Sequence, residues 1–356
     1  SFKVKPALPF NPYFCRRSTQ FLNFPISQLN MVKVGVLGAG HLGKIHLQCL
    51  SQLPAQFKVR GFFDIDPEAA RHASEKFNLP VFPKFEALLD AVDAVDIVTP
   101  TTTHFDLARQ AMLRGKHVFI EKPLTETPEE AQELVELARS QGIVAQVGHV
   151  ERFNPAMLAV SHLSLAPMFV EAHRLASFNP RGTDVPVVLD LMIHDIDIVL
   201  SLVKSAVKTI SASGVAVVSD TPDIANARIE FENGCVANLT ASRISLKQMR
   251  KVRLFQRDAY ISLDFLEKEA QIIRLFEKGK EPPDVISIEL ETPAGVKMIT
   301  METPPAESVN AIQLELKAWA ESILQGKSVA VSLEEGWRAL QVAHDVMWQI
   351  EERLAG

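Results

Sequence analysis

The sequence predicts an α/β protein of two domains, an N-terminal doubly wound parallel sheet followed by a C-terminal α/β domain with a mainly antiparallel sheet. First, an apolar strand near 32–37 leads into a glycine-rich turn and a helix. Second, strand and helix patterns alternate up to about residue 150, as in parallel sheets. Third, strands separated by turn signals dominate afterwards. We expect domains at 31–150 and 151–356.

The composition limits which classes of protein this chain can belong to. A chain of 356 residues suits two domains, and 47% apolar residues describe a globular protein. No apolar run reaches the roughly 18 residues of a membrane span. A formal charge of −6 argues against a nucleic-acid surface. Three cysteines without metal or redox spacing favour a reducing cytoplasm.

Residues 1–30 differ from the rest of the chain. They carry four basic residues, no acidic residue, and scattered Pro and Phe without periodicity. A transit peptide is one interpretation of this segment, but the sequence shows no clear amphipathic helix. We expect an extension with no assigned function ahead of a start at Met31, and a chain from Met31 that folds and binds its ligand by itself.

The glycine turn is the first chemical signal. Gly38 allows the chain to turn, Gly40 allows a pyrophosphate to approach the backbone, and Gly43 allows the following helix to pack closely. The anion would lie at the positive end of the helix dipole. Three glycines at this spacing also occur in ordinary loops, but the flanking strand and helix favour dinucleotide binding.

A carboxylate follows the next strand. Asp64 ends the apolar run 61–63, about 21 residues past Gly43. At this position an acid accepts hydrogen bonds from the adenosine ribose hydroxyls and repels a 2′-phosphate. The sequence therefore favours NAD over NADP.

The remaining elements of the first domain follow in order. A helix is expected from Asp66 to about residue 77, with Pro67 in its first turn. Thr127 is expected to cap a later helix. The loop at 99–104 follows a strand, where open α/β sheets carry function. The other predicted elements are strands at 81–82, 94–98, 117–120 and 144–148 and helices at 85–90 and 104–114.

The second half shows strand alternation. Asn233-Gly234 is the clearest hairpin turn. The predicted strands are 208–212, 225–231, 235–242, 252–255, 260–263 and 271–275. The predicted helices are 152–163, 187–203, 307–325 and 332–353.

The 187–203 helix carries the second chemical signal. Asp190, His194 and Asp197 form a polar stripe beside its apolar face. An acid one turn from a histidine fixes its tautomer and raises its pKa, which suits proton transfer near neutral pH. A solvent-facing amphipathic helix explains the same spacing. The pattern is a poor zinc signature, so we expect no metal.

Together these residues resemble the family of glucose-fructose oxidoreductase and inositol dehydrogenase. The resemblance runs from about Val32 to the C-terminus and rests on order and spacing. Its motifs are the glycine turn with His46, Asp64 in 64–67, Thr99-Pro100 with His104, Glu121-Lys122-Pro123, the Asp190/His194/Asp197 helix, and 326–331 followed by a helix.

The resemblance implies a Rossmann domain followed by a substrate-binding and oligomerisation domain with a large open sheet. It places Lys122 and His194 at the reacting carbon, with Asp190 orienting the histidine. It also implies a homodimer or homotetramer. The cofactor residues it implies are Gly38, Gly40, His41, Leu42, Gly43, Asp64, Thr99, Pro100, His104, Glu121 and Lys122.

The resemblance has one departure and one refinement. Relatives commonly have glycines ahead of the second helix and between its Asp and His, whereas this chain has 186–189 without glycine, and Met192. The stretches 148–155 and 241–245 look like the branch that includes UDP-N-acetylglucosamine 3-dehydrogenases. A sugar nucleotide needs cations for its diphosphate. The candidate substrate-binding residues are Arg152, Asn154, Arg174, Arg181 and Arg243, with Lys247 and Arg250 as further cations.

The expected reaction is reversible hydride transfer between a sugar carbon and nicotinamide. His194 would accept the hydroxyl proton and Lys122 would polarise the developing oxyanion. Two alternatives stay open: a dehydrogenase of free sugars or polyols, and a non-catalytic NAD-binding regulatory protein. Each candidate arginine can equally be a solvated surface residue.

Overall fold

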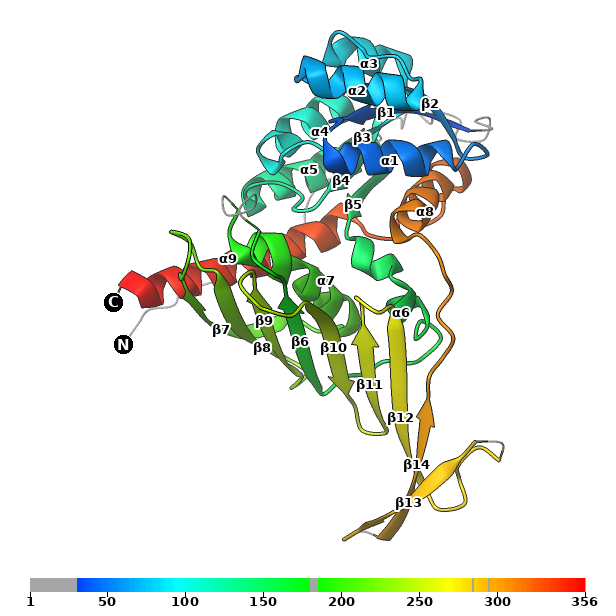
Figure 1. Ribbon diagram of the computed structural model, residues 1–356, viewed down its shortest axis with the longest axis vertical. Coiled ribbons are helices and arrows are strands. Elements are labelled where there is room, and N and C mark those ends of the chain that lie inside the picture. Colours follow the sequence, from blue (N-terminus) through cyan, green and yellow to red (C-terminus); the bar gives the residue numbers. More distant parts are fainter. Residues whose placement is uncertain (1–30, 180–184, 284, 294, 356) are drawn as a thin grey trace, which may run out of the picture.

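Five parallel strands form the first sheet, in the order β2-β1-β3-β4-β5 (Figure 1). The structure is a computed structural model, and it describes residues 31–179, 185–283, 285–293 and 295–355. The sheet strands are β1 (Val32–Leu37), β2 (Phe57–Phe63), β3 (Ala94–Ile97), β4 (His117–Glu121) and β5 (Ala145–Gly148). Its helices are α1 (His41–Ser51), α2 (Pro67–Phe77), α3 (Phe85–Ala91), α4 (His104–Leu113) and α5 (Pro128–Gln141).

The local signals of this domain are confirmed. The Asp66 side chain caps α2 by accepting from the Glu68 N–H at 2.9 Å. Thr127 and Glu130 form a reciprocal capping box at the start of α5. The strand predicted at 81–82 is smaller than expected, a single bridge between Val81 and Phe62.

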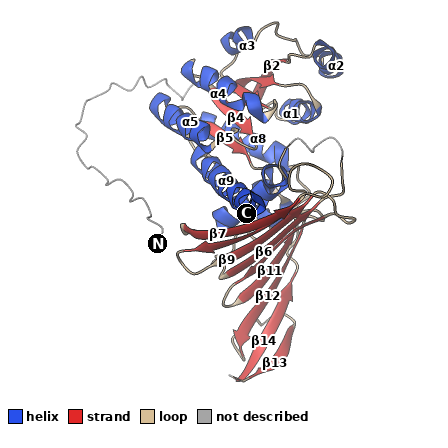
Figure 2. Ribbon diagram, turned by 90° about the vertical axis from the view of Figure 1, so that its left-hand side faces the viewer, coloured by secondary structure: helices blue, strands red, loops and turns tan. Residues whose placement is uncertain are grey.

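Nine strands form the second sheet, in the order β13-β14-β12-β11-β10-β6-β9-β8-β7. Its only parallel pair among the described strands is β6 with β9, and the other pairs are antiparallel. The β13–β14 hairpin lies at the end farthest from the first sheet (Figures 1 and 2). The strands are β6 (Phe169–Leu175), β7 (Val207–Val215), β8 (Ile224–Phe231), β9 (Val236–Ser242), β10 (Met249–Phe255), β11 (Ala259–Asp264), β12 (Glu269–Glu277), β13 (Ser287–Thr292) and β14 (Gly295–Glu302).

Two long helices follow the second sheet and connect the two halves. α8 (Ala311–Gln325) returns to the first sheet, where Trp319 is fully buried against Phe57 and Phe119. Because its apolar face is buried there, α8 packs with the first domain although the predicted boundary near 150 assigns it to the second. The boundary itself stays a prediction.

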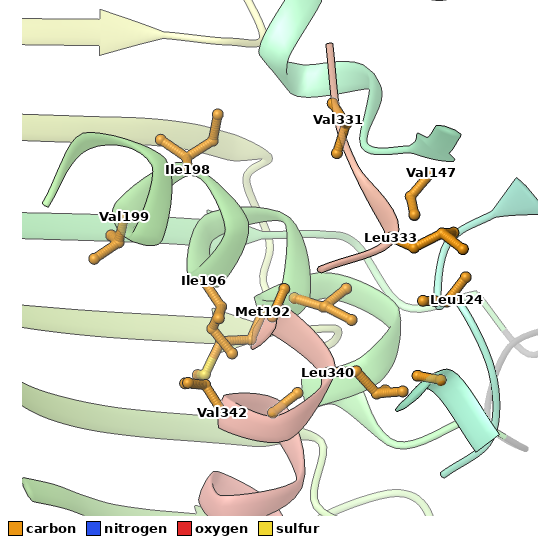
Figure 3. Packing of buried hydrophobic residues seen from close by; sticks show 14 of the residues in the cluster. Leu124, Val147, Met192, Ile196, Ile198, Val199, Val331, Leu333, Leu340 and Val342 are labelled. Carbon is orange, nitrogen blue, oxygen red and sulfur yellow. The ribbon is translucent and has the colours of Figure 1, made fainter. Parts of the chain in front are cut away.

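The core between the sheets involves α9 (Leu333–Ala355) and α7 (Ile193–Leu202). Figure 3 shows Met192 and Ile196 beside Leu340, and Leu333 beside Val147 of β5. At Gly336 in α9, an added Cβ would lie 2.7 Å from Val147. This close approach fixes the helix against the strand that leads into the site.

Some predicted elements differ from the structure, and other elements were not predicted. The helix predicted at 152–163 is only a short turn at Val150–Phe153 and α6 (Pro155–Leu158). The helix predicted at 187–203 is present, but its first part is a π-helical turn, Val188–Met192, before α7. β6, β13 and β14 were not predicted. Residues 1–30 lie outside the described residues.

Candidate functional site

The glycine turn has the geometry expected for an anion. Gly38 has φ +94°, and an added Cβ at Gly43 would lie 2.1 Å from the Gly38 carbonyl oxygen. A Cβ at Gly40 would meet nothing within 4 Å. No acidic residue occupies the first turn of α1, and Gly40 provides no side-chain cap. The free N–H groups at this helix terminus therefore fit a phosphate group.

Asp64 also fixes this turn. Its Oδ2 accepts from the Ala39 N–H at 2.5 Å, and its Oδ1 accepts from the Asp66 N–H at 2.8 Å. Each carboxylate oxygen has a second lone pair, so the group can still accept from ribose hydroxyls. His41 and Leu42 lie exposed at the start of α1 beside it.

His104 fixes the loop after β3 through its two ring nitrogens. Its ring nitrogens lie 2.9 Å from the carbonyl oxygens of Pro123 and Thr99, and the residue is 1% exposed. His104 therefore joins the Thr99-Pro100 loop to the loop after Lys122. This placement supports a role in shaping the cofactor site rather than direct contact with a cofactor.

Lys122 follows β4 directly and faces the π-helical turn. Its Nζ donates to the Asp190 carbonyl oxygen at 2.8 Å and lies 3.5 Å from Asp190 Oδ1. Burial lowers the pKa of Lys122, and the nearby Asp190 and Glu121 carboxylates oppose that shift. The lysine is thus a partly desolvated cation in the candidate site.

His194 lies one turn after Asp190 but does not behave as expected. Its Nδ1 is buried with no hydrogen-bond partner in the described structure. Burial, followed by the positive charges of Lys122 and Arg174, holds the pKa of His194 well below its usual range. The expectation that Asp190 raises this pKa was wrong, because the Asp190 carboxylate is directed toward Lys122 and the π turn alters the spacing.

Asp197 is also not part of a polar stripe. It is 1% exposed, and its two carboxylate oxygens accept from Arg152 at 2.8 and 2.7 Å. Arg152 Nη1 also donates to Glu335 at 2.9 Å. The guanidinium is neutralised by two carboxylates, so the expectation that Arg152 binds a substrate phosphate finds no support.

The other predicted substrate residues that the structure describes make contacts within the protein. Arg174 is 3% exposed and pairs with Asp195 and Glu151. Asn154 caps α6 and donates to Glu151 and the Phe265 carbonyl oxygen.

Arg243 is 5% exposed and donates to the Val185 carbonyl oxygen. It therefore packs beneath the chain near 185, and the cavity described below does not include it. Arg181 lies outside the described residues.

A cavity of about 360 Å³ brings the two chemical signals together. It extends from Leu42 at the glycine turn to Lys122, Asp190 and His194. Its remaining lining residues are Glu121, Gly148, Val150, Glu151, Arg174, Leu175, Ala176, Leu191, Gln248, Arg250 and Ile312. Two larger hollows, one of them between α5 and α9, contain none of the candidate residues.

Two residues near this cavity were not predicted from the sequence. His149 is 1% exposed, with both ring nitrogens unpartnered in the described structure and Asp197 Oδ2 at 3.9 Å. Burial lowers its pKa. Gln248 lines the cavity from the loop before β10. His149 follows the last parallel strand, and that position was the available signal.

Arg250 is an exposed cation at the cavity. No carboxylate in the described part of the chain pairs with it.

Among the described residues, no helix combines the length and the apolar composition that a membrane span requires.

Comparisons with known proteins show which family the chain belongs to. Residues 32–149 match the family described as "Oxidoreductase family, NAD-binding Rossmann fold", and residues 171–260 match "GFO/IDH/MocA C-terminal domain". The chain is 36% identical over 305 residues to UDP-N-acetylglucosamine 3-dehydrogenase of Acidithiobacillus ferrooxidans, covering 85% of this chain and 96% of that protein. It is 29% identical to scyllo-inositol 2-dehydrogenase (NAD(+)) of Bacillus subtilis, covering 61% and 68%.

Solved structures show the same fold. The Acidithiobacillus ferrooxidans UDP-N-acetylglucosamine 3-dehydrogenase structure has a TM-score of 0.82 at 35% identity, covering 91% of this chain and 99% of that one. Levoglucosan dehydrogenase in complex with NADH has a TM-score of 0.77 at 20% identity, covering 90% and 97%. The predicted Rossmann domain and open antiparallel sheet are confirmed, and the chain belongs to the Gfo/Idh/MocA family of NAD-binding oxidoreductases.

Proposed function

We propose that this protein is an NAD-dependent dehydrogenase that oxidises C3 of a UDP-linked N-acetylhexosamine. The observation that carries the proposal is the single cavity extending from the glycine turn at Leu42 to Lys122 and His194. The relative that matches 85% of the chain is named for this reaction.

The proton chemistry follows from the two half-buried residues His194 and Lys122. His194 is neutral near pH 7 because its pKa is low, so it can accept a hydroxyl proton from the substrate. Lys122 supplies a positive charge that stabilises the developing oxyanion and can share the proton. Asp190 holds Lys122 in place rather than orienting the histidine. The bound nicotinamide would accept the hydride.

Asp64 supports NAD rather than NADP. Asp64 follows β2 directly, and its carboxylate lies beside the glycine turn, where the ribose of the adenosine would lie. A 2′-phosphate there would meet a negative charge at close range. The cofactor-binding residues proposed here are the glycine turn, His41, Leu42, Asp64, the Thr99-Pro100 loop and Lys122, with His104 and Glu121 as supports.

Arg250 is the best-placed cation for a diphosphate. It is exposed at the cavity, whereas Arg152 and Arg174 are both neutralised by carboxylates. Among the described cavity residues, Arg250 is the only arginine that no carboxylate pairs with, and this favours a second candidate, a dehydrogenase of free sugars or polyols. The two candidates differ in whether the diphosphate is required for binding.

A substrate panel separates the candidates. The full chain would be incubated with NAD and UDP-N-acetylglucosamine, UDP-N-acetylgalactosamine, glucose or myo-inositol, with an amine-transfer partner to remove the keto product. We expect NADH formation with the UDP sugars alone. Turnover of free sugars would support the second candidate, and no turnover despite tight NAD binding would support a non-catalytic role.

We also propose a cytoplasmic homodimer or homotetramer. Cys49 and Cys235 are free and buried, as suits a reducing compartment. Strands of the second sheet expose large apolar side chains, which favours association through that sheet. They are Phe255, Leu275, Ile288, Leu290 and Met301. Light scattering on the purified protein would give the oligomeric state.

A further inference from the structure

A second polar cluster lies beneath the candidate active site. It consists of His46 from α1, Asp96 from β3, Glu121 from β4 and Glu315 from α8. His46, Asp96 and Glu315 are 0% exposed and Glu121 is 7% exposed. Three carboxylates thus share one buried imidazole, and buried carboxylates require a compensating charge or partner.

Asp96 orients the imidazole. Its Oδ2 lies 2.9 Å from His46 Nδ1, so the ring presents Nε2 toward Glu121 and Glu315. Nε2 is 3.1 Å from Glu121 Oε1, yet it makes no aligned hydrogen bond. A histidine that bonds a carboxylate through one nitrogen and presents the other is the arrangement found at metal sites.

Glu315 provides separate evidence for a ligand at this cluster. Both of its carboxylate oxygens are buried, and neither has a hydrogen-bond partner in the described structure. One oxygen nevertheless lies within 4.8 Å of ligand atoms from both His46 and Glu121. Three ligand atoms within 4.8 Å of one another are close enough together to bind a single ion.

The spacing fits a metal ion with nitrogen and oxygen ligands. In a tetrahedral zinc site each bond is about 2.1 Å, so ligand atoms lie roughly 3.4 Å apart. Magnesium and calcium require about six or more oxygen ligands, which this buried set does not supply. An imidazole with two carboxylates suits zinc or a similar transition metal.

We propose that His46, Glu121 and Glu315 bind one divalent transition-metal ion of the zinc class, with Asp96 as the supporting carboxylate. The site joins α8 to the first domain, since Glu315 belongs to α8 and the other two ligands to α1 and β4. It also supports the active site, because Glu121 Oε2 accepts from the Lys122 N–H at 3.1 Å. This inference is independent of the substrate proposed above.

The test measures metal binding to the full chain. Metal content would be determined after purification without chelator, and chelator-treated protein would be titrated with Zn²⁺, Mn²⁺ and Mg²⁺ by calorimetry. We expect one Zn²⁺ per chain, weaker Mn²⁺ binding, no Mg²⁺ binding, and a higher thermal midpoint with Zn²⁺. Asp96→Asn should weaken Zn²⁺ binding about 10- to 100-fold.

A matched pair of variants on α8 tests the ligand. Glu315→Gln should abolish Zn²⁺ binding and the thermal shift, whereas Glu321→Gln, whose side chain pairs with Lys327 at the surface, should change neither. Circular dichroism and NAD titration would show that both variants are folded.

Two outcomes would overturn the proposal. The first is wild-type protein that binds no Zn²⁺ or Mn²⁺ and shows no thermal shift, which would mean that protons or water occupy the cluster. The second is a folded Glu315→Gln variant that binds Zn²⁺ like the wild type, which would place the metal elsewhere.

Discussion

Lys122 Nζ lies 2.8 Å from the main-chain oxygen of Asp190 and 3.5 Å from its carboxylate. The lysine is therefore held chiefly by the backbone of the π-helical turn, a helix type often found at functional sites. The carboxylate adds charge but does not fix the position of the amine alone. The two residues should consequently respond very differently to substitution.

We expect Lys122→Met to lower kcat by roughly 10²–10⁴, as for a lost acid–base or charge-stabilising group. Asp190→Asn should lower kcat by only about tenfold or less, because the 3.5 Å contact contributes roughly 1 kcal/mol. Steady-state kinetics with the UDP sugar would measure both. Lys116→Met is the control, since Lys116 Nζ also donates to a carbonyl oxygen at 2.8 Å, away from the cavity.

An equal loss in Lys122→Met and Asp190→Asn would contradict this arrangement. It would mean that the carboxylate is essential for placing the amine, or that it acts on the substrate directly.

We expect His194→Asn to lower kcat by roughly 10²–10⁴ while NAD binding changes little. His194 lines the cavity beside Lys122 and Asp190, away from the glycine turn, and Asn retains polarity without a basic nitrogen at this pH. The losses in His194→Asn and Lys122→Met should be non-additive in the double variant, because both act on one proton path. Near-normal turnover of His194→Asn would remove the histidine from the mechanism.

The pH profile should reflect the lowered pKa values of both groups. A base must be neutral to accept a proton, and His194 in the folded protein protonates only well below its ordinary 6.5. The rate should therefore stay level as pH falls from 7 through 6.5. On the alkaline side, the lowered pKa of Lys122 means that the amine loses its positive charge at a pH lower than its ordinary pKa of 10.5. The rate should therefore begin to fall before the pH reaches that value. An acid limb centred at or above pH 6.5 that disappears in His194→Asn would contradict the first expectation.

The first domain could be predicted because its signals are local. Gly38, Gly43 and Asp64 follow from the spacing of one turn and one strand end, and the structure confirms their positions. Capping by Asp66 and Thr127 was equally visible, because a cap is satisfied within three residues.

The polar interior could not be predicted, because its partners are distant in sequence. Arg174 looked available for a phosphate, yet it pairs with Asp195 and Glu151, which no periodicity links to it. β6 was not predicted because Arg174, a charged residue, occupies one of its buried positions. Likewise, His46 and Glu315 meet only because α8 returns to the first sheet.

We expect Asp64→Ala to weaken NAD binding and to relax discrimination against NADP. Removal of the carboxylate removes an acceptor for the ribose and a repulsive charge for the phosphate. It also removes the acceptor of the Ala39 N–H, so the glycine turn loses one anchor and binding of both cofactors should suffer. Asp64→Asn is the matched variant, because it removes the charge and keeps one acceptor oxygen. Equal affinity of the unmodified protein for NAD and NADP, measured by fluorescence titration, would contradict the assignment.

Gly43→Ala and Gly40→Ala separate the structural from the binding role of the glycine turn. At Gly43 the new Cβ would lie 2.1 Å from the Gly38 carbonyl oxygen, so the turn or helix must shift at a cost of about 1–3 kcal/mol. Thermal unfolding of Gly43→Ala should therefore occur at a lower temperature. At Gly40 the Cβ meets nothing within 4 Å and φ is −65°, which other residues adopt, so stability should be unchanged.

The same methyl group at Gly40 would occupy the space that the pyrophosphate needs. NAD binding by Gly40→Ala should weaken at normal stability, which fluorescence titration beside a thermal melt would show. Normal NAD affinity in Gly40→Ala would place the pyrophosphate away from this turn. Because the two substitutions add the same single carbon three residues apart, their opposite effects on stability and affinity would locate the bound phosphate at the N-terminus of α1.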